Sequence, residues 1–468
     1  SLTSSISSDI GQLINLKYID LSDNHISGII PNTIGQLDYL EYLDFSANNL
    51  IGELPLEFSS LSNLKTLILS NNQLTGLIPS NITDLESIEH LDLSMNEFYG
   101  QIPPQIGLLD ELVLLGLYGN ELDGIIPESI TDLLNLQYLL LHNNSLGGSI
   151  PNELGNLTQM KILSLWGNYL NGPIPESIGS LTQLSELYLN NNMLNEDIPS
   201  QLFNIVSLEK LYVSDNQLSG EIPSELGNLI NLEHLYLWNN QFTGTFPQGI
   251  GNLTNLTQLN IGMNQFSGDI PNQIGNLTSL NKLYLLNNQF SGSIPSTIGN
   301  LVNLNYLFLS ANQLGGTIPE EICELNITWE GADEEGDPFY SFEGNKLCSP
   351  YPSCIINIGY QDTSNCAFAS TITDLIPFSY NLSDAYPNPF NPSTKISYEL
   401  PKNEFVRLII YDIMGREIKQ LVNTVQQAGY KSITWDATNN LNQQVSPGMY
   451  IYTIHAGSFV KSKKVILL

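Results

Sequence analysis

Leucine and isoleucine recur through most of this chain in one fixed phase. Residues 232 to 240 follow the pattern Leu-x-x-Leu-x-Leu-x-x-Asn, and the same spacing returns every 24 residues without an insertion. Alternating Leu-x-Leu predicts a short strand with one buried face. Because the period is constant, we expect successive strands to stack in register.

An asparagine, a glycine and a proline complete each unit. Glycine stands four residues after the asparagine except at Glu196, and proline stands seven residues after it in every unit. The glycine and an Ile-Pro step predict a second extended segment. The asparagine amide can donate to and accept from turn backbone that stacking removes from water. The repeated asparagines are Asn24, Asn48, Asn72, Asn96, Asn120, Asn144, Asn168, Asn192, Asn216, Asn240, Asn264, Asn288 and Asn312.

One unit cannot offset the entropy of ordering 24 residues, whereas stacked units share their buried surface. The unit resembles the 24-residue, plant-type leucine-rich repeat with its Leu-x-Gly-x-Ile-Pro signature. The resemblance implies an α/β solenoid, with a parallel sheet on the concave side and short helical turns on the convex side. It covers about residues 1 to 350, and we place thirteen full repeats and a partial first one in residues 1–322. The register at Leu2 and Ile6 suggests that the chain begins inside a repeat, with an upstream cap and a signal peptide missing.

Counting back from each asparagine, positions −3 and −5 should be buried, and positions −2, −4 and −6 should face outward from the concave sheet. The −2 and −4 positions carry mainly Asp and Ser in the first four repeats and aromatic residues from the fifth onward. Strands about 4.8 Å apart would align these rings. The predicted ligand-binding residues are Tyr118, His142, Trp166, Tyr188, Tyr212, Tyr236, Trp238 and Tyr284.

Two interpretations of this aromatic strip compete. Contiguous exposed rings usually mark a binding site, here for a protein, a peptide or a polysaccharide. Rings on neighbouring strands also stabilise a sheet without any ligand. We favour a ligand site. Four −6 residues could orient a polar ligand, but we expect a solvated rim instead; they are Glu186, Lys210, His234 and Lys282.

All four cysteines lie between residues 323 and 366, which we assign to a C-terminal cap containing an acidic insertion. They are expected to form two disulfides in an oxidising compartment. Of three possible pairings we favour Cys348–Cys354 with Cys323–Cys366. The spacings do not match a zinc site. Asp333, Glu334, Glu335 and Asp337 lack the ligand order of a calcium loop, so we expect them to be solvated and no metal to be bound.

The last 85 residues show a different pattern, with short strand-like runs separated by turns. We assign residues 367–383 to a linker and 384–468 to a small immunoglobulin-like β-sandwich. Residues 386 to 394, 406 to 417, 447 to 450 and 463 to 468 resemble the C-terminal sorting domain of the type IX secretion system of Gram-negative bacteria. The resemblance implies that this domain interacts with the type IX machinery. It also implies a protein that is secreted or held on the outer cell surface.

Charge and hydropathy exclude several classes of partner. Residues 1 to 370 hold 6 lysines, no arginine and 40 acidic residues, a net charge of −34, which would repel nucleic acid. No apolar run approaches the roughly 20 residues of a membrane span. We expect a monomer.

No catalytic constellation is apparent. His90, His142 and His234 lie in separate repeats, and an open sheet offers Asp20, Asp44 and Asp92 no cleft that excludes water. We therefore expect neither an enzyme nor a cofactor. A ligand-recognition protein is the favoured function, and the alternative is a structural adhesin without one defined ligand.

Overall fold

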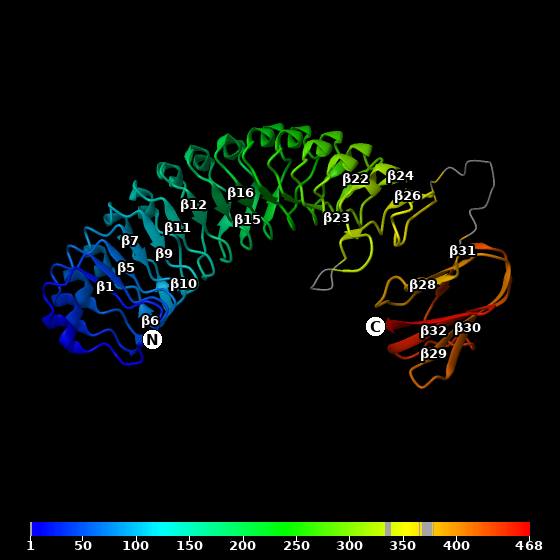
Figure 1. Ribbon diagram of the computed structural model, residues 1–468, viewed down its shortest axis with the longest axis horizontal. Helices are drawn as coiled ribbons and strands as arrows, with labels where there is room; N and C mark the ends of the chain where they lie inside the picture. Colours follow the sequence, from blue (N-terminus) through cyan, green and yellow to red (C-terminus); the bar gives the residue numbers. More distant parts are fainter. Residues whose placement is uncertain (1, 333–337, 365, 367–376, 378) are drawn as a thin grey trace. The chain divides into compact units, whose positions relative to one another are not determined.

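One short strand from each repeat joins a single long parallel sheet, which follows the inner curve of the solenoid (Figure 1). The computed structural model describes residues 2–332, 338–364, 366, 377 and 379–468. Within these residues the sheet has 14 strands. In chain order they are β1 (Tyr18–Asp20), β3 (Tyr42–Asp44), β5 (Thr66–Ile68), β7 (His90–Asp92), β9 (Leu114–Gly116), β11 (Tyr138–Leu140), β12 (Ile162–Ser164), β14 (Glu186–Tyr188), β16 (Lys210–Tyr212), β18 (His234–Tyr236), β19 (Gln258–Asn260), β21 (Lys282–Tyr284), β23 (Tyr306–Phe308) and β25 (Tyr340–Ser341).

The strand register keeps equivalent residues side by side. Leu211 pairs with Leu187 on one side and with Leu235 on the other, and all three side chains are fully buried. Their neighbours at −4 therefore point to the opposite face of the sheet. The buried residues form one continuous core along the whole solenoid.

The Ile-Pro half of each repeat builds the flank and the convex side. The flank holds short parallel strands, namely β2 (Ser27–Gly28), β4 (Asn49–Gly52), β6 (Gln73–Leu77), β8 (Glu97–Gln101), β10 (Glu121–Asp123), β13 (Asn171–Gly172), β15 (Met193–Asp197), β17 (Gln217–Ser219), β20 (Ser267–Asp269), β22 (Gln289–Ser291), β24 (Gly315–Thr317) and β26 (Lys346–Cys348). The convex side holds 3-10 helices, namely η1 (Ser8–Gln12), η2 (Asn32–Gln36), η3 (Leu56–Ser60), η4 (Ser80–Asp84), η5 (Ile106–Leu108), η6 (Glu128–Asp132), η7 (Leu154–Asn156), η8 (Glu176–Ser180), η9 (Ser200–Asn204), η10 (Ser224–Asn228), η11 (Gln248–Asn252), η12 (Asn272–Asn276), η13 (Ser296–Asn300) and η14 (Glu320–Glu324).

The repeated asparagine ties each unit to the one before it. Asn144 Nδ2 donates to the carbonyls of Leu117, at 2.9 Å, and of Leu141, at 3.1 Å. Its Oδ1 accepts from the backbone N–H of Leu122 at 3.0 Å. Leu117 and Leu122 belong to the preceding repeat, so one amide satisfies buried backbone groups in two turns of the solenoid.

The repeat glycine lies where the backbone is left-handed, as at Gly220 with φ +76°. Glu196 replaces this glycine and still adopts φ +64°. The neighbouring repeats therefore hold residue 196 in a conformation that a side chain disfavours.

The cap continues both sheets beyond Asn312. β25 pairs with β23, and β26 pairs with β24. Asn345 repeats the asparagine contacts, because its Oδ1 accepts from the N–H of Leu314 at 3.0 Å and its Nδ2 donates to the carbonyl of Leu309 at 2.8 Å. The core of the last full repeat is therefore covered by one more turn.

The favoured disulfide pairing was wrong. The bonds join Cys323 to Cys354 and Cys348 to Cys366. After β26 the chain reaches η14, where Cys354 is bonded to Cys323 and both cysteines pack against the core. The chain then returns along β26, where Gln361 bridges to Asn345 and brings Cys366 to Cys348. Asp333, Glu334, Glu335 and Asp337 lie outside the described residues.

The chain divides into two compact units, Ser1–Cys366 and Ala367–Leu468. The second unit is an antiparallel sandwich with a buried core that includes Trp435, Tyr398 and Tyr452. Trp435 Nε1 donates to the carbonyl of Thr438 at 3.0 Å, so the buried indole is satisfied. One sheet contains β27 (Asn381–Leu382), β28 (Thr394–Leu400) and β31 (Gly429–Trp435), and the other contains β29 (Glu404–Asp412), β30 (Glu417–Gln426), β32 (Gly448–Ala456) and β33 (Phe459–Leu467).

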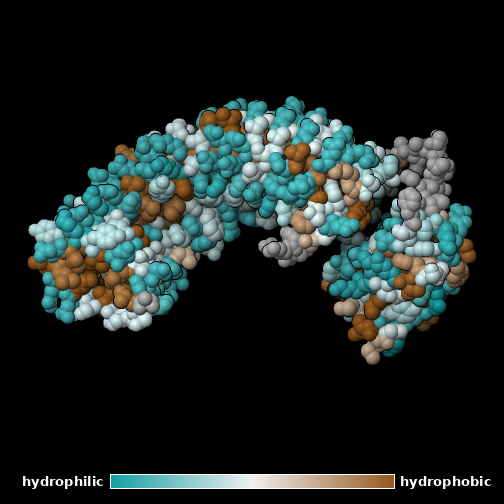
Figure 2. Space-filling model, in the orientation of Figure 1, coloured by the Kyte–Doolittle hydropathy of each residue, from teal (hydrophilic) through white to brown (hydrophobic). Residues whose placement is uncertain are grey.

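The solenoid surface visible in Figure 2 is mostly hydrophilic, and its hydrophobic patches are most extensive toward the N-terminal end. Among the described residues, no helix has the length and apolar character that crossing a bilayer requires.

Candidate ligand-binding surface

A ladder of three tyrosines lies on the outward face of β14, β16 and β18. Tyr188 pairs with Tyr212, which pairs with Tyr236. The ring centroids of Tyr188 and Tyr212 are 5.1 Å apart, and those of Tyr212 and Tyr236 are 4.6 Å apart with an interplanar angle of 6°. Each ring is half-buried by its neighbours. This burial raises the pKa of Tyr212 to about 12, so its hydroxyl stays protonated at neutral pH.

A second stack lies one column away and nearer the N-terminus. The rings of Tyr118 and His142 are 4.3 Å apart, and those of His142 and Trp166 are 5.0 Å apart, both with nearly parallel planes. Ser164 Oγ lies 2.9 Å from His142 Nδ1. Burial lowers the pKa of His142 from 6.5 to about 4, which keeps the imidazole neutral at physiological pH.

The strip continues toward the C-terminus through Trp238 and Leu286, which cover a glycine. A Cβ placed on Gly262 would lie 3.2 Å from Trp238 Cδ1 and 2.9 Å from Leu286 Cδ2. Tyr284 then stacks on Phe308 with centroids 4.9 Å apart. Leu286 and Phe308 were not among the predicted site residues, although their −2 and −4 positions could have identified them.

The −6 residues Glu186 and His234 contact phenol hydroxyls instead of forming a freely solvated rim. Tyr188 donates to Glu186 Oε2 at 2.7 Å, and Lys210 Nζ lies 3.0 Å from Glu186 Oε1. Tyr212 Oη lies 2.8 Å from His234 Nδ1. These contacts fix the rings at their hydroxyl edge, which side-chain spacing alone does not reveal.

Two more contacts extend this polar edge. Tyr236 donates to Gln258, whose amide nitrogen lies 3.2 Å from His234 Nε2. Lys282 Nζ lies 5.2 Å from the centroid of the Tyr306 ring, a cation–π arrangement. Burial, followed by the charge of Lys210, lowers the pKa of His234. The edge therefore offers neutral donors and acceptors together with the charged side chains of Glu186, Lys210 and Lys282.

In the first four repeats, the outward carboxylates bond to serines two residues further along the same repeat. Asp20 Oδ1 accepts from the N–H of Ser22 at 3.0 Å and from its Oγ at 2.7 Å. Asp44 makes the same two contacts with Ser46. His90, His142 and His234 lie at separate repeats, so the structure does not bring these histidines together.

Models of known families match both units of the chain. The leucine-rich repeat region model matches residues 1–123 and 212–325, which together are half of the chain, and two further leucine-rich repeat models match residues 135–157 and 158–218. The secretion system C-terminal sorting domain model matches residues 384–468. Among curated protein sequences, none matches the chain.

Solved structures resemble the solenoid. The ectodomain of the Arabidopsis thaliana receptor kinase GASSHO1/SCHENGEN3, in complex with CASPARIAN STRIP INTEGRITY FACTOR 2, is 34% identical over 75% of this chain and 44% of its own, with a TM-score of 0.65. The plant peptide hormone receptor RGFR1, in complex with RGF2, is 33% identical over 77% of this chain and 63% of its own, with a TM-score of 0.64.

A leucine-rich repeat protein of Leptospira interrogans is 31% identical over 74% of this chain and 85% of its own, with a TM-score of 0.58. The chain thus spans less than two thirds of the length of the two plant receptors and most of the length of the Leptospira protein. The repeat spacing, the asparagine contacts and the family models agree. The chain belongs to the leucine-rich repeat proteins and carries a C-terminal secretion sorting domain.

Proposed function

We propose that this protein is an exported recognition protein whose concave aromatic strip binds an extended peptide segment of another protein. The strip begins at Tyr118 beside β9 and ends at Phe308 on β23, eight strand steps away. At about 4.8 Å per step this is roughly 38 Å, the length of about 12 extended residues. A ligand of that length would contact both stacks.

The orientation of the rings favours a peptide over a glycan as the ligand. The inner members of each stack, His142 and Tyr212, have both faces covered by parallel or tilted neighbours. Sugars pack their C–H groups against open ring faces, whereas apolar side chains also pack along ring edges. The adjacent donors and acceptors on Glu186, Lys210 and Gln258 supply partners for peptide groups.

The solved relatives support the same choice. Two of them are plant receptors in complexes whose partners are CASPARIAN STRIP INTEGRITY FACTOR 2 and RGF2, and the second is described as a peptide hormone receptor. We infer that residues 384–468 direct export through the type IX system and that the protein acts outside the cell, secreted or on the surface of a Gram-negative bacterium. We propose no catalytic role, no cofactor and a monomeric state.

A selection of random 12-residue peptides on the full chain tests the binding proposal. The Trp166→Ala/Trp238→Ala variant should lose at least about tenfold in affinity for selected peptides, because large rings dominate binding energy at interfaces. The matched control is Asp20→Asn/Ser22→Ala on the same sheet, which should bind as the wild type does. Ring-dependent signals on a glycan array without peptide binding would reject the peptide in favour of a glycan. Cell clumping that survives loss of the rings would favour the structural adhesin.

Export is tested separately. Deleting residues 384–468 in a cell with a type IX system should leave the protein inside the cell. Equal secretion of the shortened and full chains would contradict the export proposal without affecting the ligand proposal.

A further inference from the structure

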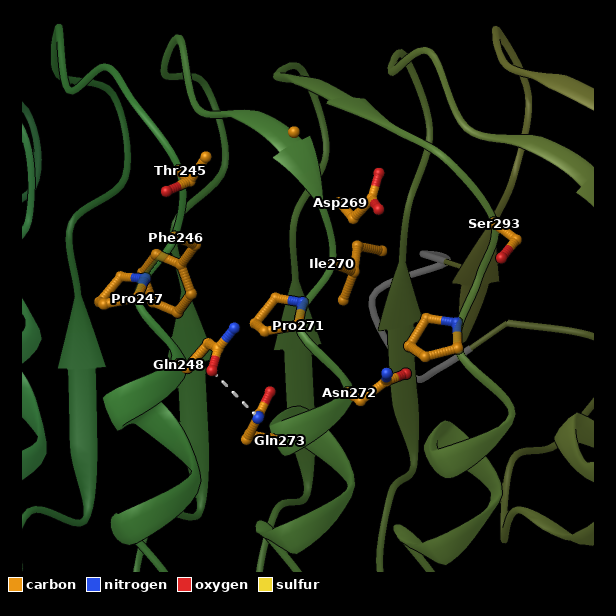
Figure 3. Close-up of a pocket in the computed structure, with 12 residues that line it drawn as sticks. Thr245, Phe246, Pro247, Gln248, Asp269, Ile270, Pro271, Asn272, Gln273 and Ser293 are labelled. Carbon is orange, nitrogen blue, oxygen red and sulfur yellow. Dashed lines mark hydrogen bonds between the residues drawn. The ribbon is translucent and has the colours of Figure 1, made fainter.

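A groove opens on the flank of the tenth to twelfth repeats and shares no residue with the concave strip (Figure 3). Its volume of about 600 Å³ lies within the roughly 300 to 1,000 Å³ typical of small-ligand sites. Polar side chains line its two sides, and prolines from three repeats lie between them. The polar residues are Thr245, Asp269 and Ser293 on the side of the flank strands, and Gln248, Asn272 and Gln273 on the side of η11 and η12. We call this site the flank groove.

The floor of the flank groove is apolar and held by the core. Pro247 and Pro271 line it together with Phe246 and Ile270, which are each only 4% exposed. Phe246 stands at a position that holds isoleucine in eleven of the thirteen repeats. Its ring packs edge-on against the buried Phe266, with centroids 5.4 Å apart. A ligand in the groove would therefore meet a rigid apolar surface.

Short side chains on the strand side leave the groove open. In the second to fourth repeats the equivalent residues are Glu53, Leu77 and Gln101, whose side chains are longer. The Gln101 side chain extends over the next repeat, because a Cβ placed on Gly124 would lie 2.9 Å from its Cγ. The repeat architecture therefore accepts long side chains at this position, and packing does not require the short ones of the groove.

Four polar side chains of the groove are free to bind a ligand. Within the part of the chain that the structure describes, the side chains of Thr245, Asp269, Asn272 and Ser293 make no hydrogen bond or ion pair. Three of these groups, the two hydroxyls and the amide, can both donate and accept, whereas the carboxylate only accepts. A ligand that satisfies all four must therefore carry several donors and several acceptors.

The carboxylate of Asp269 is free although a serine stands beside it. Asp197 is the equivalent residue three repeats earlier, and its Oδ1 accepts from Ser219 Oγ at 3.1 Å. Ser291 occupies the same place in the strand register next to Asp269, yet these two side chains form no hydrogen bond. The flank can thus satisfy such a carboxylate internally, and in the groove it does not.

The charge of the groove disfavours an anionic ligand. None of its lining residues is a lysine, an arginine or a histidine. Lys282, which belongs to β21 of the concave sheet, is the one lysine between residues 211 and 345, a range without arginine. An anion would therefore meet the Asp269 carboxylate with no cation beside it.

A peptide strand finds no sheet edge to pair with in the groove. The prolines of the floor have no N–H to donate. β20 pairs with β22 on one side, and Ser267 of β20 bridges to Thr245 on the other, so the flank backbone is already paired. No exposed aromatic residue lines the groove to anchor a peptide side chain.

We propose that the flank groove binds a short segment of a neutral glycan. Sugar hydroxyls donate and accept, so they match the carboxylate of Asp269, the hydroxyls of Thr245 and Ser293 and the amide of Asn272. The C–H groups of the sugar ring pack on the proline floor. This glycan site is separate from the peptide site of the concave strip, and each can be occupied without the other.

Soluble neutral tetrasaccharides test this proposal directly. Maltotetraose, cellotetraose, laminaritetraose and mannotetraose are each titrated into the full chain and followed by calorimetry. Tetragalacturonic acid is the anionic control, and the glucosamine tetramer of chitosan is the cationic control. At least one neutral sugar should bind saturably and more tightly than both charged controls.

The groove variant Asp269→Ala/Asn272→Ala should weaken binding of that sugar about tenfold, because it removes a charge-assisted hydrogen bond and an amide. The matched control Asp197→Ala/Ser200→Ala changes the same positions three repeats earlier and should bind as the wild type does. Trp166→Ala/Trp238→Ala should also bind normally, which separates the groove from the concave strip.

A second groove variant, Thr245→Gln/Ser293→Gln, keeps Asp269 and Asn272 and narrows the groove with the side chain found at Gln101. It should also weaken binding about tenfold, because the longer side chains occupy space that the sugar needs. Circular dichroism melting should be unchanged in both groove variants, since all four substituted side chains are exposed.

Four results would overturn the proposal. They are no binding of any neutral tetrasaccharide, equal sugar affinity in the wild type and both groove variants, tighter binding of a charged control, and loss of sugar binding in the tryptophan variant alone. The third would assign the groove to a charged ligand, and the fourth would assign the glycan to the concave strip.

Discussion

The two ends of the concave sheet share a backbone and differ in how their outward side chains make contacts. In the first repeats, Asp20 and Asp44 accept hydrogen bonds from serines two residues further along the same repeat. The hydrogen bonds from Ser22 hold the pKa of Asp20 below its ordinary value. From Tyr118 onward, rings stack on rings of the next repeat. The first end therefore satisfies its carboxylates within each repeat and has a stacked ring pair, Tyr18 with Tyr42, whereas the second end couples successive repeats through runs of three rings.

This difference indicates that the stability of the solenoid and the recognition of a ligand depend on different side chains. The asparagine contacts are the same at both ends, as at Asn48 and Asn144, so the stacking of repeats does not need the rings. The rings add cross-strand contacts of modest energy and a large apolar surface facing outward. Four predictions sharpen the comparison.

The largest effect is expected from Asn144→Ala. It removes the donor to Leu117 and the acceptor for Leu122 and leaves buried backbone groups unsatisfied, at a cost of about 2 to 4 kcal/mol. Asn48→Ala should cost a similar amount in urea unfolding followed by circular dichroism. A cost confined to the aromatic end would show that the two ends are stabilised differently.

The second-largest effect is expected from the loss of a single ring. Tyr212→Ala removes the middle of the tyrosine ladder and should weaken binding of a selected peptide by about tenfold, measured by calorimetry. Asp20→Asn at the other end should change affinity less than about twofold. Equal losses for both variants would mean that the ligand covers the whole concave face.

A pH effect should appear at the histidine of the second stack. Burial lowers the pKa of His142 to about 4, below its ordinary 6.5, so between these pH values the unfolded chain binds a proton that the folded chain does not. Stability should therefore fall as pH drops from 6.5 to 4. The urea midpoint of the wild type should decrease more over this window than that of His142→Phe. Parallel decreases would show that His142 does not contribute.

The smallest effect is expected from Tyr212→Phe. The change keeps the ring stack and removes the hydroxyl that contacts His234 at 2.8 Å, a loss of about 1 kcal/mol or less in unfolding. Peptide affinity should change less than with Tyr212→Ala. A full loss of binding would show that the hydroxyl edge, and not the ring, holds the ligand.

The repeat spacing predicted most of the solenoid because each structural requirement lies within one unit. The Leu-x-Leu alternation assigned Leu187, Leu211 and Leu235 to the core, and the same phase aligned Tyr188, Tyr212 and Tyr236 on the other face. The buried role of the asparagine amide followed from its place at the turn. Such local, periodic patterns can be recognised in the sequence because the chain repeats them thirteen times.

Tertiary structure alone decided the features that depend on non-periodic chain paths or on side-chain direction. The disulfides depend on how the segment after β26 reaches η14 and returns to Asn345, which cysteine spacing does not encode. The contacts of Gln258 and His234 depend on rotamers across strands.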